Sequence, residues 1–492
     1  MTGQQKRVAM VGVLLTLILA VLDQNIVSTA SWSIVGELDP AHGLERLPWL
    51  VTAYSLAATA ALPLYGKLCD VYGAKRIYLG AVAVFLAGSA LCGLAQDMGQ
   101  LIAFRAVQGL GGGGLMSVTL VVAAHLTPAD KRASAGVAGG LLAGLGMVAG
   151  PLIGGLFTDH LSWRWIFFIN LPVGLFVLVS AAAAIRLRDG GLRHRIDYPG
   201  AALVAAAACL LLLVVEWGGR TYAWNSPAML ALIALDVALF AAFGWRQLAA
   251  AEPILPLSMF RDRTLGIALP LQLLTGFGMA GGLLYTVVYL QAAMGVQATD
   301  SGLYLIPMAA GMVLSGTVSG VLIAKGRATK PFLVAGTACV TASMALLSLL
   351  RTDTSPWTLR FDLLLMGVGL GMVLGIVVML VQNSAAPSQL GVATTAIRFT
   401  QVLGSALGTA VFGIVLNRAT ESRLPSGLDA RSLSAALPPQ TRARVVQALV
   451  DGVDVVFVSA AGVMAAALVL AALLRTSRPA AAEPPPPVRA GV

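Results

Sequence analysis

The chain has 492 residues, of which 58% are hydrophobic and only 11% are charged, and its formal net charge is +10. A soluble domain carries roughly 25% charged residues, so this composition excludes an ordinary soluble protein and indicates an integral membrane protein. The excess of Lys and Arg would suit a nucleic-acid binder, but these residues lie in short segments between apolar runs and form no continuous basic stripe. We therefore expect the lipid bilayer as a partner, and no nucleic acid.

Apolar runs long enough to cross a bilayer recur along the chain. A spanning helix needs about 20 apolar residues. The run that follows Lys6 and Arg7 loosely imitates a cleaved signal peptide, but polar Asp23, Gln24 and Asn25 interrupt it, so we interpret it as an uncleaved first helix. In all we predict fourteen transmembrane helices, with approximate spans 8–29, 48–66, 77–96, 101–125, 133–157, 164–186, 197–216, 226–245, 264–290, 301–324, 331–350, 358–381, 392–416 and 453–474.

The distribution of Lys and Arg sets the orientation. With the N-terminus inside, the predicted cytoplasmic segments hold 20 of these residues, the short outer segments hold five, and a long outer loop at about 417–452 holds five more. Cytoplasmic loops of membrane proteins carry the excess of Lys and Arg. We therefore predict a multi-pass protein of the cell (inner or plasma) membrane with both termini in the cytoplasm.

Glycine spacing suggests an internal repeat. Small residues four apart let membrane helices pack closely. Such glycines occur in the fifth predicted helix at Gly146, Gly150 and Gly154, and in the thirteenth at Gly404 and Gly408, which Gly413 follows. These two helices correspond if a six-helix unit is repeated with two extra helices between the copies. We predict an all-α membrane fold with an N-terminal six-helix bundle (1–190), two additional helices (191–260), a C-terminal six-helix bundle (261–476) and a disordered cytoplasmic tail (477–492).

A charged segment at 66–76 separates the second and third predicted helices, and we predict a short turn bounded by glycines. Its spacing resembles the loop at this place in transporters of the major facilitator superfamily, and it departs at Val71, where that family usually carries a basic residue. The resemblance implies a latch that holds the two halves of a transporter in one of two states. The alternative is a turn that only sets topology. The candidate gating residues are Gly66, Asp70, Gly73, Lys75 and Arg76.

The same resemblance implies where Asp70 would bond. The contact would be made with the thirteenth helix, which we expect to begin near Gly391 and Val392. A helix N-terminus favours an anion because its first backbone N–H groups are unpaired. A nearby cation is a further expected partner, with Arg398 as another candidate. This contact would stabilise the state that is closed toward the cytoplasm.

Asp23 lies well inside the first predicted helix, and an ionisable residue in such a place is a functional candidate by default. The stretch that contains it resembles the first-helix motif of drug:proton antiporters, but Asn25 replaces the usual threonine and Trp32 the usual proline. A carboxylate here can bind and release a proton if burial favours its neutral form. The alternative is a structural ion pair.

Arg105 lies inside the fourth predicted helix, one turn before Gln108 and Gly109. The stretch resembles the fourth-helix motif of the same family, in which the arginine serves proton transfer. Because arginine stays protonated, it would tune Asp23 or hold a substrate or water. Both Asp23 and Arg105 fall in the outer half of the bilayer on the predicted spans. The alternative is an arginine that snorkels to the outer interface.

Two further segments resemble antiporters. The run 163–174, WRWIFFINLPVG, closely resembles the fourteen-helix antiporter branch. The fifth predicted helix resembles the motif that marks exporters, with an ordinary glycine-rich packing face as the alternative. Its motif residues are Gly146, Gly150, Pro151, Gly154 and Gly155.

Other polar and aromatic residues within the spans are weaker candidates. Glu216 is expected at an interface, Asp236 to be structural, and Arg398 to snorkel. The candidates for substrate contact, for which core or lipid packing is the alternative, are Gln24, Asn25, Tyr54, Gln108, Phe277, Tyr285, Tyr289 and Asn383.

The chain carries no catalytic signature. Its four cysteines form no CxxC pair, its four histidines are scattered, and HExxH and nucleophile-elbow motifs are absent from the sequence. We expect no enzyme, no metal and no cofactor, with the proton as coupling ion. The resemblance implies a monomeric fourteen-helix drug:proton antiporter that exports small amphipathic, often cationic compounds. Export of a lipid or natural product is one alternative, and a membrane enzyme or receptor is another.

Overall fold

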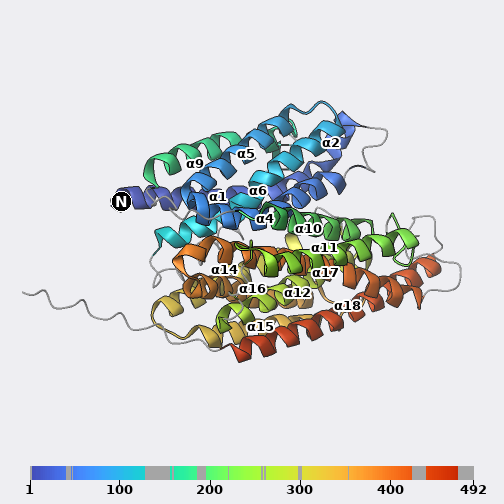
Figure 1. Ribbon diagram of the computed structural model, residues 1–492. Helices are drawn as coiled ribbons and strands as arrows, with labels where there is room; N and C mark the ends of the chain where they lie inside the picture. Colours follow the sequence, from blue (N-terminus) through green and yellow to red (C-terminus); the bar gives the residue numbers. More distant parts are fainter. Residues whose placement is uncertain are drawn as a thin grey trace, which may run out of the picture.

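The computed structural model describes residues 3–39, 46, 48–127, 154, 156–157, 160–185, 196–219, 221–255, 259, 262–296, 302–352, 354–423 and 439–474. Regular structure in these ranges is helical, apart from one isolated bridge between Gly218 and Tyr222. The helices form two packed groups, with two further helices beside them (Figure 1).

The first group holds the N-terminal helices, which are drawn in blue to teal in Figure 1. Within it α6 packs against both α4 and α5, and α9 packs against α1 and α5. The members are α1 (Gly3–Thr29), α2 (Ser31–Leu38), α4 (Pro48–Tyr72), α5 (Ala74–Leu94), α6 (Met98–Leu126), α8 (Trp165–Phe168) and α9 (Asn170–Ala184).

The second group holds the C-terminal helices, which run from yellow-green to red in Figure 1. Here α12 packs against α17 and α18, and α16 packs against α14 and α15. A short 3₁₀ turn, Pro387–Gln389, directly precedes α17. The members are α12 (Arg263–Ala292), α14 (Ile306–Ala324), α15 (Thr329–Leu347), α16 (Pro356–Ser384), α17 (Leu390–Glu421) and α18 (Pro439–Leu473).

The two remaining helices, α10 (Tyr198–Trp217) and α11 (Pro227–Ala249), lie beside the junction of the groups (Figure 1). Helix α10 packs against α4 of the first group and α17 of the second. Val204 and Ala208 of α10 share a buried apolar cluster with Leu62 and Phe399. Helix α11 packs on α10, and most of its side chains are exposed, as expected of a helix that faces lipid.

Twelve helices in the described part of the chain are long and apolar enough to span a membrane. Helix α4 is not among the twelve, although its 25 residues cover the second predicted span. The fifth predicted span, 133–157, falls almost wholly outside the described residues. The protein is therefore a multi-pass membrane protein, and the count of fourteen stays a prediction.

Two boundaries differ from the sequence predictions. The segment 66–76 was predicted as a short turn, but it is helical except at Gly73, because α4 continues to Tyr72 and α5 begins at Ala74. Gly73 alone separates these helices, with a positive φ of 87° that a side chain would disfavour. Asp70 therefore projects from the last turn of α4.

The other difference is at the C-terminal end. Residues 441–449 were predicted within the long outer loop at about 417–452, but they belong to the 35-residue helix α18. No proline or glycine interrupts the chain between Thr441 and Asp451, so the helix continues without a break.

Glycines bring α6 very close to its neighbours. A Cβ atom at Gly109 would overlap the carbonyl oxygen of Tyr54, and one at Gly113 would overlap that of Ala58, both on α4. The packing role predicted for the thirteenth helix is confirmed, because Gly404 of α17 meets the backbone of α12 in the same way. Close approach of α6 to α4 and α5 positions the polar residues on its first two turns.

Candidate functional site

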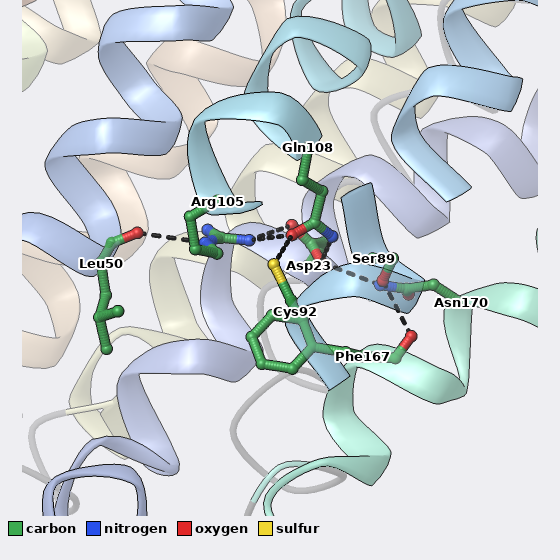
Figure 2. A network of polar contacts seen from close by, with 8 residues as sticks. All are labelled: Asp23, Leu50, Ser89, Cys92, Arg105, Gln108, Phe167 and Asn170. Carbon is green, nitrogen blue, oxygen red and sulfur yellow. Dashed lines mark hydrogen bonds and ion pairs between the residues drawn. The ribbon is translucent and has the colours of Figure 1, made fainter. Parts of the chain in front are cut away.

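A closed polar network surrounds the carboxylate of Asp23 in the first helix group (Figure 2). Its Oδ2 atom accepts a hydrogen bond from Nη1 of Arg105 at 3.0 Å. Its Oδ1 atom accepts one from Nε2 of Gln108 at 2.8 Å and one from Nδ2 of Asn170 at 2.9 Å. The side chain of Asp23 is 0% exposed and that of Arg105 is 2% exposed. Three helices, α1, α6 and α9, thus meet at one carboxylate.

Arg105 is fixed by further contacts. Its Nε atom donates to the carbonyl oxygen of Leu50 at 3.1 Å, and Nη1 also donates to Oε1 of Gln108 at 2.8 Å. The guanidinium carbon lies 4.3 Å from the ring centroid of Tyr54, a cation–π distance. The predicted proximity of Arg105 to Asp23 is confirmed. The snorkelling alternative is wrong, because the guanidinium is buried among four side chains and a backbone carbonyl.

Asn170 was not predicted to take part. It begins α9, and its Nδ2 atom donates to Oγ of Ser89 at 2.9 Å as well as to Asp23. Ser89 in turn donates to the carbonyl oxygen of Phe167 at 2.9 Å. In the sequence, this role was indicated only by the amide side chain of Asn170 within the apolar run 163–174. Pro172 lacks the N–H that would bond to residue 168, which matches the break between α8 and α9 that places Asn170 here.

The chemistry of this network follows from its charges. A buried ion pair is tolerated when its remaining donors and acceptors are satisfied, and removal of one partner leaves an uncompensated charge. Protonation of Asp23 would remove the negative charge of the ion pair, while Arg105 stays positively charged. A proton at Asp23 therefore changes the interaction of α1 with α6 and α9, within a site that seals the carboxylate from solvent.

Asp70 links the two helix groups. Its Oδ1 atom accepts a hydrogen bond from the backbone N–H of Gly391 at 2.8 Å, and Oδ2 accepts one from Val392 at 3.0 Å. These N–H groups lie at the start of α17, as predicted, where the helix dipole favours an anion. Glycine is needed on both sides, since a Cβ atom at Gly391 would lie 2.5 Å from the carbonyl oxygen of Gly66.

The cations near this contact include two at the start of α5, Lys75 and Arg76. Lys75 donates to the carbonyl oxygen of Ala182 at 2.8 Å, which attaches α5 to α9. Arg76 is exposed. Arg398 was the alternative partner for Asp70, and this is wrong, because it lies two turns further along α17 and donates to Oε1 of Gln401 at 2.9 Å.

A cavity of about 230 Å³ lies between the two groups. Its described lining comes from α1 and α6 on one side and from α12, α14, α16 and α17 on the other, and it is mostly apolar. Gln382 closes part of one edge by donating from Nε2 to the carbonyl oxygen of Leu120 at 3.3 Å. The polar residues of the described lining are Thr127, Gln272, Ser319, Gln382, Arg398 and Gln401.

The predicted substrate contacts lie elsewhere. Tyr54 and Gln108 belong to the Arg105 network. Phe277 packs edge-to-face on Phe412 with ring centroids 5.0 Å apart, and Tyr285 packs on the same ring at 6.2 Å. None of these four lines the cavity within the described part of the chain.

Several other predicted residues have simpler positions. Tyr289 is buried and its hydroxyl donates to the carbonyl oxygen of Arg351 at 2.6 Å. Asn383 is exposed near the end of α16, and Asp236 is buried on α11. The side chains of Gln24 and Asn25 lie outside the described residues, as do four residues of the fifth-helix motif, Gly146, Gly150, Pro151 and Gly155. Gly154 of that motif is helical and buried.

Comparisons with known proteins agree with this architecture. The chain is 35% identical to an uncharacterized MFS-type transporter of Mycobacterium tuberculosis, over 91% of this chain and 66% of that protein. It is 34% identical to a multidrug transporter protein of Bacillus subtilis, over 84% of this chain and 76% of that protein. The crystal structure of the human organic anion transporter MFSD10 (TETRAN) shares the fold, with a TM-score of 0.65, 95% of this chain and 99% of that chain covered, and 15% identity.

The likeness to MFSD10 concerns the fold alone at this identity. The family assignment rests on sequence, because residues 13–409 match the model of the Major Facilitator Superfamily. This range contains the Asp23 network, the Asp70 contact and all the described cavity lining except Met10. The chain therefore belongs to the Major Facilitator Superfamily, a family of membrane transporters and not of enzymes.

Proposed function

We propose that this protein exports small amphipathic molecules from the cytoplasm by exchange for protons. The observation that carries the proposal is the fully buried carboxylate of Asp23, which is held by Arg105, Gln108 and Asn170 in the interior of a membrane helix group. Burial of an ionisable group inside a membrane helix costs free energy, so such a group is a candidate for proton transfer. The name of the Bacillus subtilis relative, a multidrug transporter, supports transport of drug-like small molecules.

In this proposal the protein has fourteen membrane helices, works as a monomer and keeps both termini in the cytoplasm. The two extra helices, α10 and α11, attach to the junction between the bundles without entering the cavity within the described residues. On the predicted orientation, the cavity lies toward the cytoplasm, because it is lined by the first half of α1 and the second halves of α6 and α14. A substrate from the cytoplasm would enter there.

Proton binding and substrate release would be coupled through Asp23. In the unprotonated state the carboxylate ties α1 to α6 and α9. A proton that arrives from the outer side would neutralise it, weaken its bond to Arg105, and favour rearrangement of the bundle. Arg105 would remain charged and would favour return of the proton to water, which resets the pair. Rocking of the two bundles about the cavity would then expose the substrate to either side.

Asp70 would control which state is populated. Its two bonds to the start of α17 join the bundles on the side that the predicted orientation makes cytoplasmic. These bonds stabilise the state that is closed toward the cytoplasm, and they must break before the cytoplasmic side opens. Gly66 and Gly391 serve the latch by allowing the two backbones to approach.

The proposal is tested with purified protein in vesicles that carry an imposed proton gradient. The panel contains lipophilic cations, amphipathic acids, neutral drugs and fluorescent phospholipids. We expect gradient-dependent transport of small amphipathic molecules, and none when the gradient is collapsed with an ionophore. Transport confined to phospholipid would replace the proposal with lipid export. Transport that ignores the proton gradient would overturn the proposed coupling.

A further inference from the structure

The cavity contains an arginine whose charge is not balanced by the described residues that surround it. Arg398 is the one charged residue in the described lining, which contains no Asp or Glu. Its Nη1 atom donates to the neutral amide oxygen of Gln401 at 2.9 Å. No carboxylate among the described residues forms an ion pair with it, whereas Arg105, in the other helix group, has Asp23 at 3.0 Å.

This arrangement favours a bound anion. A guanidinium has five N–H donors in a planar fork that matches a carboxylate or sulfonate, and Gln401 accepts only one hydrogen bond. A cation enclosed by membrane helices is unfavourable unless an anion or water compensates it. A second polar group points the same way, because Gln272 is 1% exposed, lines the cavity, and has an Oε1 atom without a hydrogen-bond partner among the described residues. That oxygen is an acceptor for a hydroxyl or N–H group on a ligand.

The remainder of the described lining suits an apolar body. Leu17 and Val21 of α1, Met312 of α14 and Leu374 of α16 all line the cavity. Binding sites of this kind bury an apolar ligand body and use a few polar groups to orient it. A lipophilic cation would meet Arg398 as a like charge and would find no carboxylate in the described lining with which to pair.

We propose that Arg398 anchors the acidic group of the substrate, so that the protein prefers amphipathic monoanions, such as aryl carboxylates and sulfonates, over cations of the same shape. Gln401 is a positioning residue, because its amide oxygen orients the guanidinium. The inference rests on the proposed export function and narrows its substrate class.

The test uses three probes that share one pyrene ring and a four-carbon chain: pyrenebutyric acid, its primary amide and pyrenebutylamine. Binding is measured by fluorescence to purified protein in lipid nanodiscs, without a proton gradient, and the signal of empty nanodiscs is subtracted. The acid is expected to bind at least tenfold more tightly than the amide, and the amine most weakly. Arg398→Gln is expected to weaken binding of the acid by about ten- to hundredfold, as loss of a charged hydrogen bond predicts, and to leave the amide within about threefold.

Two variants control the interpretation. Arg327→Gln removes the same charge from an exposed position beyond the end of α14, and it is expected to change none of the three affinities. Arg398→Lys keeps the charge without the planar fork, and it is expected to recover part of the preference for the acid. It also provides the test if Arg398→Gln does not yield a monodisperse, cooperatively melting protein.

Equal affinity of the wild-type protein for the acid and the amide would overturn the inference, and so would an unchanged preference in both Arg398 variants. A preference for the amine would also overturn it. Because binding is measured without a gradient, the two proposals fail separately. Anion-selective binding in a protein that shows no proton-driven transport would contradict the proposed function and leave the anion subsite in place.

Discussion

Two arginines within the membrane helices carry the same local motif and have opposite surroundings. Arg105 donates from Nη1 to Gln108, three residues later, at 2.8 Å, and Arg398 donates from Nη1 to Gln401, also three residues later, at 2.9 Å. The spacing of one helical turn explains both bonds. Arg105 has in addition the carboxylate of Asp23, whereas Arg398 lies on a cavity with no carboxylate in its described lining.

The difference shows that residues distant in the sequence determine whether the charge of a membrane arginine is paired with a carboxylate. Where α1 supplies a carboxylate, the charge is neutralised within the bundle, and we propose that this pair couples transport to protons. Where the described residues supply only an amide, we propose that the acidic group of a ligand supplies the compensating charge. The first arginine is thus suited to coupling and the second to recognition.

The largest effect is expected from breaking the first pair. Arg105→Ala leaves a buried carboxylate without its cation, which destabilises a protein by about 3–5 kcal/mol. We expect loss of active transport and a lower melting temperature. Arg105→Lys should restore the charge but not full transport, because lysine cannot donate to Asp23, Gln108 and Leu50 from a planar fork. Transport assays and thermal melts of both variants decide this, and full activity of the lysine variant would show that charge alone matters.

The next effect concerns the packing that brings the first pair together. Gly109→Ala places a methyl group into the carbonyl oxygen of Tyr54, and such overpacking destabilises by about 1–3 kcal/mol. The matched control is Gly80→Ala on α5, where a Cβ atom meets nothing within 4 Å. Alanine there is a better helix former than glycine, so a neutral or slightly raised melting temperature is expected. Equal melting temperatures for the two variants would contradict the close approach of α6 to α4.

A smaller effect is expected at the junction of the two bundles. Asp70→Asn removes the charge that accepts from Gly391 and Val392, which is worth about 1–3 kcal/mol. Since about 1.4 kcal/mol shifts a two-state balance tenfold, the inward-facing state should gain roughly ten- to hundredfold in relative population. Turnover should slow while proton binding at Asp23 remains.

The readout for Asp70 is the accessibility of engineered cysteines from each side of the membrane. The background is a variant without the native cysteines, Cys69, Cys92, Cys209 and Cys339. Increased labelling of the cytoplasmic side of the cavity is expected. An unchanged labelling pattern would reduce the segment 66–76 to a topology signal.

The smallest of these effects is expected at Asn170. Asn170→Ala removes one of three hydrogen bonds to Asp23 and leaves the ion pair with Arg105, so a loss of about 1 kcal/mol is expected. Transport should fall about fivefold, and the protein should still fold. A loss as complete as that of Arg105→Ala would mean that the amide, rather than the ion pair, holds the carboxylate in place. Gradient-driven uptake by the two variants at equal protein content makes the comparison.

The sequence was sufficient for the parts of the site that depend on local spacing and on resemblance. Helix spans, the encounter of Asp23 with Arg105, and the bonding of Asp70 to Gly391 and Val392 were all predicted. In the structure, the close packing of the α6 glycines on α4 brings the polar side chains of the network together. The Asp70 contact was implied by the resemblance to major facilitator transporters, and the proximity of Asp23 to Arg105 by their places on the predicted spans.

The sequence was insufficient where tertiary packing determines which residues a side chain contacts. Asn170 reads as one amide in an apolar run, and its role depends on how α9 is set against α1 and α5. Phe277 and Tyr285 were favoured for substrate contact because they are aromatic, but their rings pack on Phe412. Arg398 was expected to snorkel, and only the placement of α17 beside α12 and α16 shows that it lines a cavity.

Coupling through Asp23 is tested most directly by Asp23→Asn, because asparagine keeps the size of the side chain and cannot take up a proton. Purified variant and wild-type protein are reconstituted in vesicles, and two rates are measured: exchange of labelled for unlabelled substrate without a gradient, and uptake driven by a proton gradient. We predict that the variant retains exchange and loses gradient-driven uptake. Gradient-driven accumulation at the wild-type level in Asp23→Asn would contradict the account and move proton coupling to another residue.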